Sequence, residues 1–210
     1  MKKSLQIYIL ILTVFSFPSC TVFGSWKYNQ KINNIDFSQI KYAIKQKDTT
    51  AIIGFLKHNT TIQGYPCAAD WVHFNKKWEM SLFRLSDTAT INNFLYQKDT
   101  WIRLTKSGLI CTFPRDTIVQ GYLCKGGGGA KGVQTRFLRS GKLDAFFTEK
   151  GSIIDGIKCK GGGLDLIQLN ENGLLKECIL AEDQLIKGVQ YKKGTKIQID
   201  PDGKIKVKGK

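Results

Sequence analysis

Apolar and polar residues alternate over short runs through most of the chain, and each run ends in a turn that contains glycine. The last run is the clearest: Ile197 and Ile199 precede an Asp-Pro-Asp-Gly segment at 200–203, and Ile205 and Val207 follow it. Proline presets one backbone φ and glycine supplies a positive φ, as a tight hairpin loop requires. The alternation therefore predicts a β-hairpin with these four aliphatic side chains on its buried face.

The same pattern recurs earlier, as apolar runs on both sides of turns that end at Gly108, Gly141 and Gly173. A second phrase lies midway between these turns, and it consists of Asp or Asn, a few residues, an aliphatic residue, one further residue and Gly. It occurs at 59–64, 116–121 and 183–188, with degenerate copies at 87–93 and 150–156. The spacing gives a unit of roughly thirty residues. Each unit is predicted to be a β-hairpin plus a connecting third segment.

The N-terminal part of the chain lacks this repeat. Residues 21–36 are polar and predict a tether, and Ser38 is placed to cap a short helix that carries Ile40, Ala43 and Ile44 on one face. We therefore expect an all-β repeat protein of about five hairpin units over 52–210, in an extended meander or solenoid. A short N-terminal helix or tether is expected to occupy the rest of 20–51.

The first residues have the pattern of an export signal. Lys2 and Lys3 precede an apolar run at 5–17, which is short for a membrane-spanning helix and typical of a signal-peptide core. The run leads into Ser19 and Cys20. A small residue directly before a cysteine resembles the lipobox of bacterial lipoproteins. The resemblance implies a signal peptide over 1–19 and a Cys20 that becomes diacylglyceryl-modified, so that it forms the new N-terminus. Plain secretion with cleavage nearby and an uncleaved anchor are the alternatives.

The repeat region resembles MORN-type hairpin modules and, more closely, the uncharacterised repeat lipoproteins of Gram-negative bacteria. The resemblance covers about 52–210. The unit is longer than a MORN repeat, and the Tyr-x-Gly and His-Gly elements of that family are mostly absent. The resemblance implies an interaction or scaffold role, with no catalytic residues to transfer.

The charge of the chain is strongly positive. Its 210 residues hold 32 Lys and Arg against 17 Asp and Glu, which gives a formal net charge of +15. Residues 187–210 alone hold eight Lys and two Asp. Such a surface attracts anionic lipid or polysaccharide, although it also serves simply as a solvated, aggregation-resistant surface. Possible contacts with an anionic surface are the lysines at the C-terminus: Lys192, Lys193, Lys196, Lys204, Lys206 and Lys208.

Candidate catalytic and metal-ligating residues are few. The two histidines, His58 and His73, have no Cys or carboxylate at ligand spacing, so neither a metal nor a cofactor is expected. Three of the cysteines recur at one register of the repeat, at Cys67, Cys124 and Cys159. A repeated position favours packing, and a disulfide or a metal or redox role is the alternative.

The glycine runs that follow Cys124 and Cys159 lack the Gly-Lys-Ser/Thr of a phosphate loop and predict flexible loops instead. Asp87, Asp116 and Asp183 share a register with Asn59, so these positions are expected to form turn hydrogen bonds and not to act as general acids.

These patterns together predict a non-enzymatic, membrane-anchored interaction or scaffold lipoprotein of the cell envelope, at the cell or outer membrane and facing the periplasm. An envelope protein or an anionic polysaccharide is the expected partner, and nucleic acid is not. The alternatives are a binder of anionic envelope polymers or lipids and, more distantly, a hydrolase. A binder needs aromatic and cationic side chains on one face, and the candidate aromatics are Trp71, Trp78, Trp101 and Tyr122.

Overall fold

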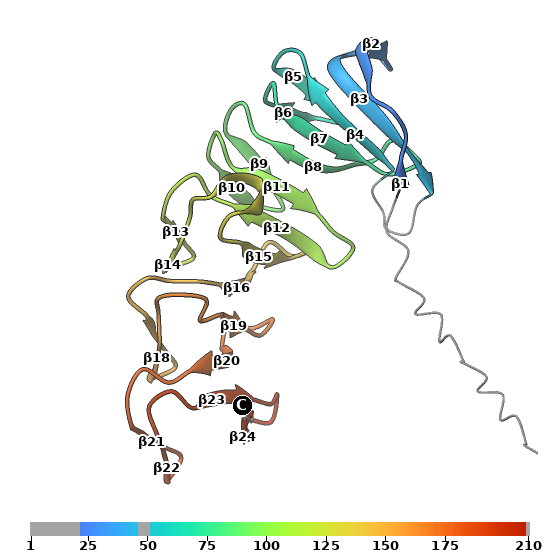
Figure 1. Cartoon of the computed structure of the whole chain (residues 1–210). Helices are drawn as coiled ribbons and strands as arrows, with labels where there is room; N and C mark the ends of the chain where they lie inside the picture. Colours follow the sequence, from blue (N-terminus) through green and yellow to red (C-terminus); the bar gives the residue numbers. More distant parts are fainter. Residues whose placement is uncertain (1–21, 46–50, 209–210) are drawn as a thin grey trace, which may run out of the picture.

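A computed structural model describes residues 22–45 and 51–208. Its main feature is one 14-stranded antiparallel sheet that runs through the described residues as an open, curved meander (Figure 1). The strands of this sheet are β1 (Val22–Phe23), β2 (Lys27–Ile32), β3 (Ile35–Lys45), β4 (Ile52–Leu56), β7 (Trp71–Phe74), β8 (Met80–Arg84), β11 (Trp101–Leu104), β12 (Gly108–Thr112), β15 (Thr135–Leu138), β16 (Leu143–Phe146), β19 (Ile167–Leu169), β20 (Leu175–Ile179), β23 (Lys196–Ile199) and β24 (Ile205–Val207). The all-β fold is therefore confirmed.

Five small hairpins interrupt the meander, each inserted between two neighbouring strands of the main sheet, and they follow one long edge of the molecule (Figure 1). They are β5 (Thr60–Ile62) with β6 (Tyr65–Cys67), β9 (Ala89–Ile91) with β10 (Phe94–Tyr96), β13 (Thr117–Val119) with β14 (Tyr122–Cys124), β17 (Ser152–Ile154) with β18 (Ile157–Cys159), and β21 (Gln184–Ile186) with β22 (Val189–Tyr191). One repeat therefore contributes two long strands and one small hairpin.

The turn of every small hairpin is built from two residues with positive φ. In the third hairpin Gln120 has φ 49° and Gly121 has φ 90°. Two successive positive φ values define a type I′ turn, whose twist matches that of the flanking strands. The other four hairpins repeat this geometry at 63–64, 92–93, 155–156 and 187–188. The aliphatic-x-Gly phrase of the sequence thus marks the middle of a hairpin.

The Asp or Asn side chain that begins each copy of the aliphatic-x-Gly phrase accepts a hydrogen bond at the base of its hairpin in three of the repeats. The Asn59 side chain accepts a hydrogen bond from the Ala69 N–H at 2.8 Å, and Asp116 accepts one from the Gly126 N–H at 3.0 Å. Asp183 likewise accepts from the Lys193 N–H at 2.8 Å. These oxygens each satisfy a backbone donor ten residues further on. The expected hydrogen-bonding role is confirmed at these positions.

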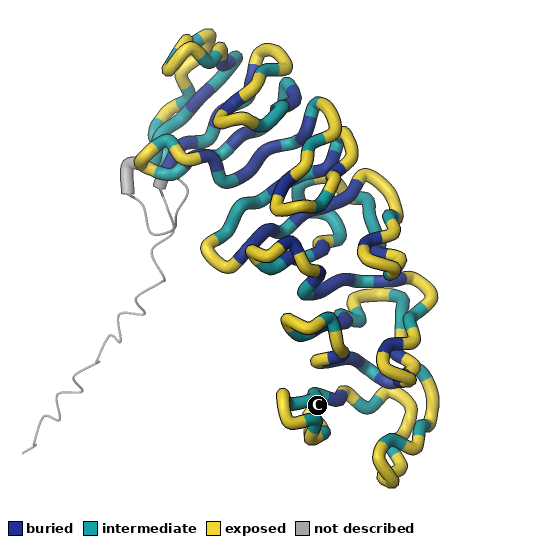
Figure 2. Tube along the Cα trace, turned by 180° about the vertical axis from the view of Figure 1, so that it is seen from behind, coloured by how far each residue is buried: buried dark blue, intermediate teal, exposed yellow. Residues whose placement is uncertain are grey.

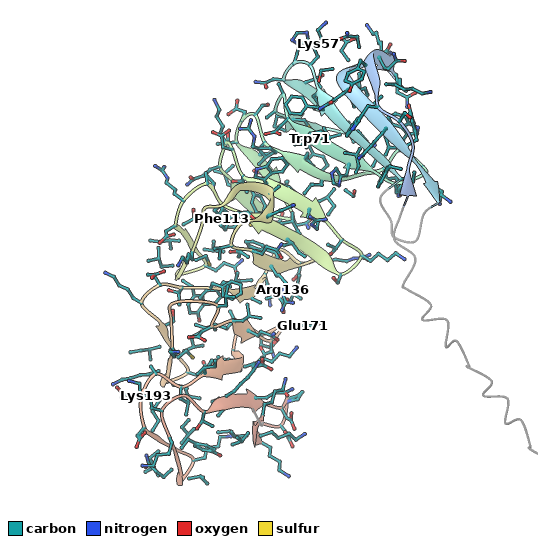
Figure 3. The ribbon with its side chains drawn as sticks, in the orientation of Figure 1. Lys57, Trp71, Phe113, Arg136, Glu171 and Lys193 are labelled. Carbon is teal, nitrogen blue, oxygen red and sulfur yellow. The ribbon has the colours of Figure 1, made fainter. Side chains whose placement is uncertain are left out.

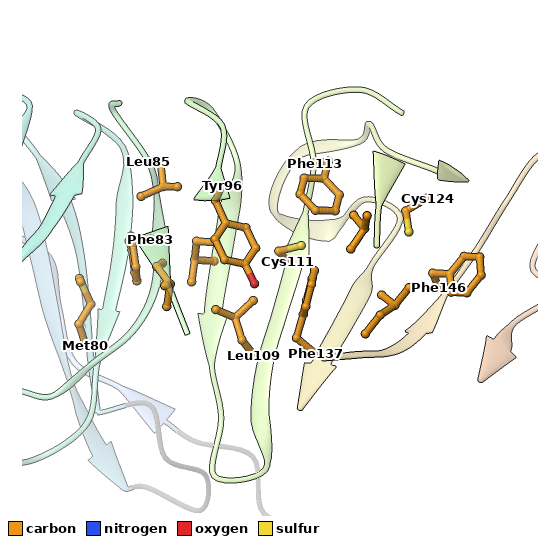
Figure 4. Packing of buried hydrophobic residues seen from close by; sticks show 14 of the residues in the cluster. Met80, Phe83, Leu85, Tyr96, Leu109, Cys111, Phe113, Cys124, Phe137 and Phe146 are labelled. Atoms are coloured by element: carbon orange, nitrogen blue, oxygen red, sulfur yellow. The ribbon is translucent and has the colours of Figure 1, made fainter. Parts of the chain in front are cut away.

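The hairpins cover one face of the sheet, and the core lies between the two layers. Tyr96 from β10 lies 5.5 Å from Phe137 and 6.2 Å from Phe113, between ring centroids, and all three side chains are buried (Figure 4). Tyr122 from β14 lies 5.3 Å from Phe146 in the same way. Burial therefore follows the strand centres, and exposure follows the turns along the edges (Figure 2). Most of the hydrophobic stabilisation comes from this covered face.

The repeats form a meander and not a solenoid. Each repeat places two strands in the sheet, so equivalent residues of neighbouring repeats lie about 10 Å apart. Cys124 and Cys159 occupy such equivalent positions, and both are buried free thiols, as are Cys67, Cys111 and Cys178. Burial raises the pKa of Cys67 and of Cys124 to about 12, so these thiols remain protonated and unreactive.

The predicted N-terminal helix is wrong. Residues 38–44 belong to β3, which pairs with β2 on one side and β4 on the other. The Ser38 hydroxyl donates to the Phe55 carbonyl at 3.2 Å, across the sheet, and caps no helix. Interstrand pairing outweighed the weak helical periodicity because Phe37 and Ile40 gain full burial in the sheet. The predicted tether also contributes β1 and β2, so the sheet begins before residue 52.

The final hairpin follows the prediction with one exception. Ile197 is fully buried, and Ile199 and Ile205 pack against the core as half-buried residues. Val207 is 58% exposed, because β24 is the last strand of the sheet and has no neighbour beyond it.

Candidate functional site

The face of the sheet opposite the hairpins carries the most distinctive side chains. Antiparallel register places one residue from each strand in a row across this face. The row runs through Lys41, Ile53, His73, Leu82, Arg103, Ile110 and Arg136. A parallel row contains Gln39, Phe55 and Trp71, and then Arg84, Trp101 and Thr112. We call these thirteen positions the uncovered face.

Aromatic rings cluster at the N-terminal end of the uncovered face. The Trp71 ring centroid lies 5.2 Å from that of Phe55 and 5.6 Å from that of Trp26, which belongs to the segment between β1 and β2. The Lys41 ammonium lies 4.3 Å from the Trp26 centroid and 5.0 Å from that of Phe23. Both distances are within the range of cation–π attraction. All of these side chains are half-buried, so part of each ring remains accessible.

An arginine held by two carboxylates lies between the two tryptophans of the uncovered face. The Arg84 Nε donates to Asp70 at 2.7 Å, and its Nη1 donates to Asp99. Trp101 is directly opposite Arg84 on the neighbouring strand. The two carboxylates fix the guanidinium plane, and its remaining N–H groups are available as donors.

The first glycine run, residues 126–129, lies beside Trp101. It forms a 3-10 turn, η1 (Gly129–Lys131), that contacts β12. The Gly126 N–H is bound by Asp116, and the Gly127 N–H donates to the Phe113 carbonyl at 2.8 Å. An added Cβ at Gly129 would meet the Trp101 indole nitrogen at 3.9 Å. The run was predicted as a flexible loop, but backbone hydrogen bonds define its course beside Trp101.

The C-terminal part of the same face is different, because its charges pair with one another. Glu177 is almost fully buried and binds Lys196 at 2.7 Å and Lys208 at 2.5 Å. Burial alone would raise the pKa of Glu177, but the hydrogen bonds and charges of the two lysines outweigh it and lower the pKa. Lys206 binds Asp200 at 2.7 Å.

Four of the six lysines proposed to contact an anionic surface therefore already hold a carboxylate. Lys196, Lys206 and Lys208 are on the sheet, and Lys192 binds Asp183 at 2.8 Å on the last hairpin. Lys193 and Lys204 are exposed. Figure 3 shows Lys193 on the hairpin side of the molecule, far along the sheet from Trp71. The structure divides these six lysines between the end of the last small hairpin and the last two strands of the main sheet with their flanking residues, so they do not form one patch.

The four candidate aromatics separate between the two faces. Trp71 and Trp101 lie on the uncovered face with Arg84 between them. Trp78 packs against Phe74 and Phe37 on the covered face, and Tyr122 packs there against Phe146. Trp71 and Trp101 alone among the four share a face with cationic side chains, which was the stated requirement for a binder.

A second exposed feature follows the outer surface of the hairpins. Leu95, Ile118, Ile153 and Leu185 occupy the centres of successive hairpins and are 61%, 71%, 66% and 70% exposed. Each of these strands has only three residues, so nothing in the sequence distinguishes the outward aliphatic residues from the inward ones.

Concave and metal-binding features are weak. An open hollow of about 460 Å³ lies beside the turns of the last repeats, but two of its carboxylates, Asp144 and Asp200, hold ion pairs with Arg136 and Lys206. Within residues 22–45 and 51–208, no group of three His, Cys, Asp or Glu side chains is arranged to hold a metal ion. His58 is exposed at the start of the first hairpin, and His73 is part of the uncovered face.

Cys20 lies outside the described residues, as does the apolar segment before it. In the described part of the chain, no helix is long and apolar enough to cross a bilayer.

Sequence reasoning missed two arginines of the uncovered face and a tryptophan that packs against its N-terminal end. Arg84 and Arg103 occur singly and form no motif, and Trp26 lies in the segment that was predicted to be a tether. A signal was present on two strands: Trp71 shares its phase with His73, and Trp101 with Arg103, opposite the buried Val72 and Ile102. Large aromatics in the polar phase of a strand indicate a surface with a use other than packing.

Comparison with known proteins adds no relative: no family model, no curated protein and no solved structure matches this chain.

Proposed function

We propose that this chain is a lipid-anchored, non-enzymatic interaction module of the bacterial cell envelope, which contacts its partner through the uncovered face. The observation that carries the proposal is the composition of that face. It contains Lys41, Arg84, Arg103 and Arg136 together with Phe55, Trp71 and Trp101, in rows that cross the sheet from β3 to β15. Aromatic and arginine side chains are enriched where proteins bind partners.

The shape of the sheet supports binding over a distance and not catalysis in a pocket. The face is an open, curved surface, and its polar groups are distributed along rows and do not converge on one point. An enzyme site requires convergent groups in a concave, water-excluding environment. An extended surface instead suits a partner that is itself extended.

The test compares two faces of one protein. Envelope vesicles from a host strain that lacks the protein are incubated with purified protein without its acyl chains. The variants are Trp101→Ala with Arg103→Ala on the uncovered face, and Ile118→Ser with Ile153→Ser on the outer surface of the hairpins. We expect the first pair to lose vesicle binding and the second pair to keep it. Equal binding by both pairs would show that the uncovered face is not the contact surface.

The anchor is tested separately. Several acyl chains hold a protein stably on a bilayer, whereas one holds it marginally. Cys20→Ala should therefore move the full chain from the membrane fraction to the soluble fraction. Retention of this variant in the membrane fraction at high salt would contradict lipidation at Cys20.

A further inference from the structure

We infer that the ligand of the uncovered face is an acidic polysaccharide. Its sugar rings would rest on Trp71 and Trp101, and its carboxylates would meet Lys41 and Arg103. This inference rests on the proposed function, since it names the ligand class of the same face. Three properties of the face support it: the placement of its rings, the sign of its charges and the donors held between the rings.

The rings are placed as separate platforms along a line. Trp71 and Trp101 belong to β7 and β11, which are separated by the single strand β8. Two strand spacings place the tryptophans about 10 Å apart, a distance that a short oligosaccharide spans. The C–H groups on one side of a sugar ring carry partial positive charge, and the face of an indole ring is negative. Each tryptophan therefore offers a platform for one sugar of a chain.

The charges of the face are complementary to an acidic chain. Its thirteen positions include four cations, Lys41, Arg84, Arg103 and Arg136, and contain no Asp or Glu. Asp70 and Asp99 both pair with Arg84, so this cluster carries a net charge of −1, and Asp144 lies 3.2 Å from Arg136. Lys41 and Arg103 form no ion pair within the described residues. These two cations lie on the long row at β3 and β11, so they flank the position of Trp71 on β7.

Arg84 supplies directed donors for hydroxyl groups. The carboxylates of Asp70 and Asp99 fix its guanidinium between the two tryptophans, so little further ordering is needed when a ligand binds. An arginine that already holds two carboxylates favours a hydroxyl over a third carboxylate. Gln39, at one end of the same row, is half-buried and adds a neutral hydrogen-bonding group. A sugar polymer presents hydroxyls between its acidic groups, and a simple polyanion does not.

The probes separate these contributions. Polygalacturonate presents carboxylates on sugar rings, polyglutamate presents carboxylates without sugar rings, and dextran presents sugar rings without charge. Affinity for each is measured by calorimetry with the protein lacking its acyl chains, at 0.1 M salt. We expect polygalacturonate to bind at least about tenfold more tightly than either of the other two, because only this polymer meets the rings and the cations together.

Two variants assign the binding to the face. Arg103→Gln should weaken polygalacturonate binding about tenfold, and its matched control, Lys193→Gln, removes the same charge on the last hairpin and should leave the affinity unchanged. Trp101→Leu should weaken binding by about three- to tenfold. A melting temperature within a few degrees of the wild type checks that each variant is folded.

Each remaining outcome overturns the inference. Equal affinity for polygalacturonate and polyglutamate would mean a charge-driven surface suited to an acidic protein. Equal affinity for dextran would remove the acidic requirement. No binding to any of the three, together with vesicle binding that depends on Trp101 and Arg103, would overturn the polysaccharide and leave the proposed function intact.

Discussion

The two faces of the sheet use the same kinds of residue for different purposes. On the covered face, Tyr96, Phe113 and Phe137 are buried against a second layer of small hairpins. On the uncovered face, the Phe55 and Trp71 rings contact each other, Trp101 lies opposite Arg84, and all three side chains remain half-exposed. The same strands form both faces, because successive side chains along each strand point to opposite sides of the sheet. Stability should therefore depend on one phase of each strand and binding on the other.

The hairpin layer explains how an open sheet can support this division. A flat sheet of this length would expose both faces, and a two-stranded hairpin alone is marginally stable. Here the first turn residue of four of the five hairpins is hydrogen-bonded to the main sheet or its turns. The Gln120 side chain accepts from the Leu143 N–H at 3.0 Å and donates to the Gly141 carbonyl at 2.8 Å. The Gln63 side-chain Oε1 accepts from the Met80 N–H at 3.0 Å in the same way.

The largest expected difference between the two faces is the loss of stability when an aromatic ring is removed. Phe137→Ala removes a buried ring that lies 5.2 Å from Phe94 and 5.5 Å from Tyr96, and should lower the free energy of unfolding by about 3–5 kcal/mol. The matched control is Phe55→Ala on the uncovered face, where the same change should cost about 1 kcal/mol. Urea unfolding measures both. Similar losses would mean that the faces do not differ in their share of the core.

The next effect concerns the attachment of the hairpins. Gln120→Ala leaves the Leu143 N–H and the Gly141 carbonyl without their partner, so it should lower the free energy of unfolding by about 1–2 kcal/mol. Gln190 is an exposed glutamine at the centre of the last hairpin, and Gln190→Ala is the matched control. Hydrogen exchange at β13 and β14 should accelerate in the first variant only. Unchanged exchange there would show that the turn does not hold the hairpin to the sheet.

The sequence predicted the strands of the main sheet well and the small hairpins poorly. Turns such as 172–173 and 200–203 lie between alternating runs of four or more residues, so periodicity identifies both strands. The small hairpins have three residues in each strand, too few for alternation to appear. Their turns at 120–121 and 187–188 begin with Gln and Lys, which are uncommon at positive φ. Interactions with the next strand of the main sheet favour this conformation, and a local sequence does not contain them.

The candidate site was predicted only in part, for a related reason. Alternation assigns Trp71 and Trp101 to the phase opposite Val72 and Ile102, so their common face could be deduced. Their neighbours depend on register between strands, and the bulge between His73 and Phe74 shifts that register. Arg84 pairs with Asp70 and Asp99 at separations of 14 and 15 residues, across the β7–β8 hairpin in the first case and the small β9–β10 hairpin in the second. A single sequence does not reveal such pairs.

The third prediction concerns the charged end of the uncovered face. The pKa of Glu177 is lowered in the folded protein, so the ion pairs with Lys196 and Lys208 stabilise the fold above the ordinary carboxyl pKa. This stabilisation is lost as pH falls from the ordinary carboxyl range through the lower, folded pKa. Both lysines are nearly half-exposed, so we expect a loss of about 1 kcal/mol.

Glu177→Gln removes the titrating group and isolates its contribution. The variant should be less stable than the wild type at pH 7 by about 1 kcal/mol, and the difference should vanish at a pH well below the ordinary carboxyl pKa. Asp202→Asn, in the exposed last turn, is a control that removes one carboxylate without these ion pairs. A difference between wild type and Glu177→Gln that is constant with pH would contradict the assigned ion pairs.

The smallest expected effect distinguishes two arginines of the uncovered face. Arg103 forms no ion pair within residues 22–45 and 51–208, so Arg103→Gln should change the free energy of unfolding by less than about 0.5 kcal/mol. Arg84 holds Asp70 and Asp99, so Arg84→Gln should cost about 1 kcal/mol and leave two carboxylates without their partner. Urea unfolding at low and high salt separates the two, because only the Arg84 variant should lose part of the salt dependence. If Arg103→Gln were the more destabilising of the two, Arg103 would be part of the structural support of the sheet, and the uncovered face would lose the cation on which binding depends most.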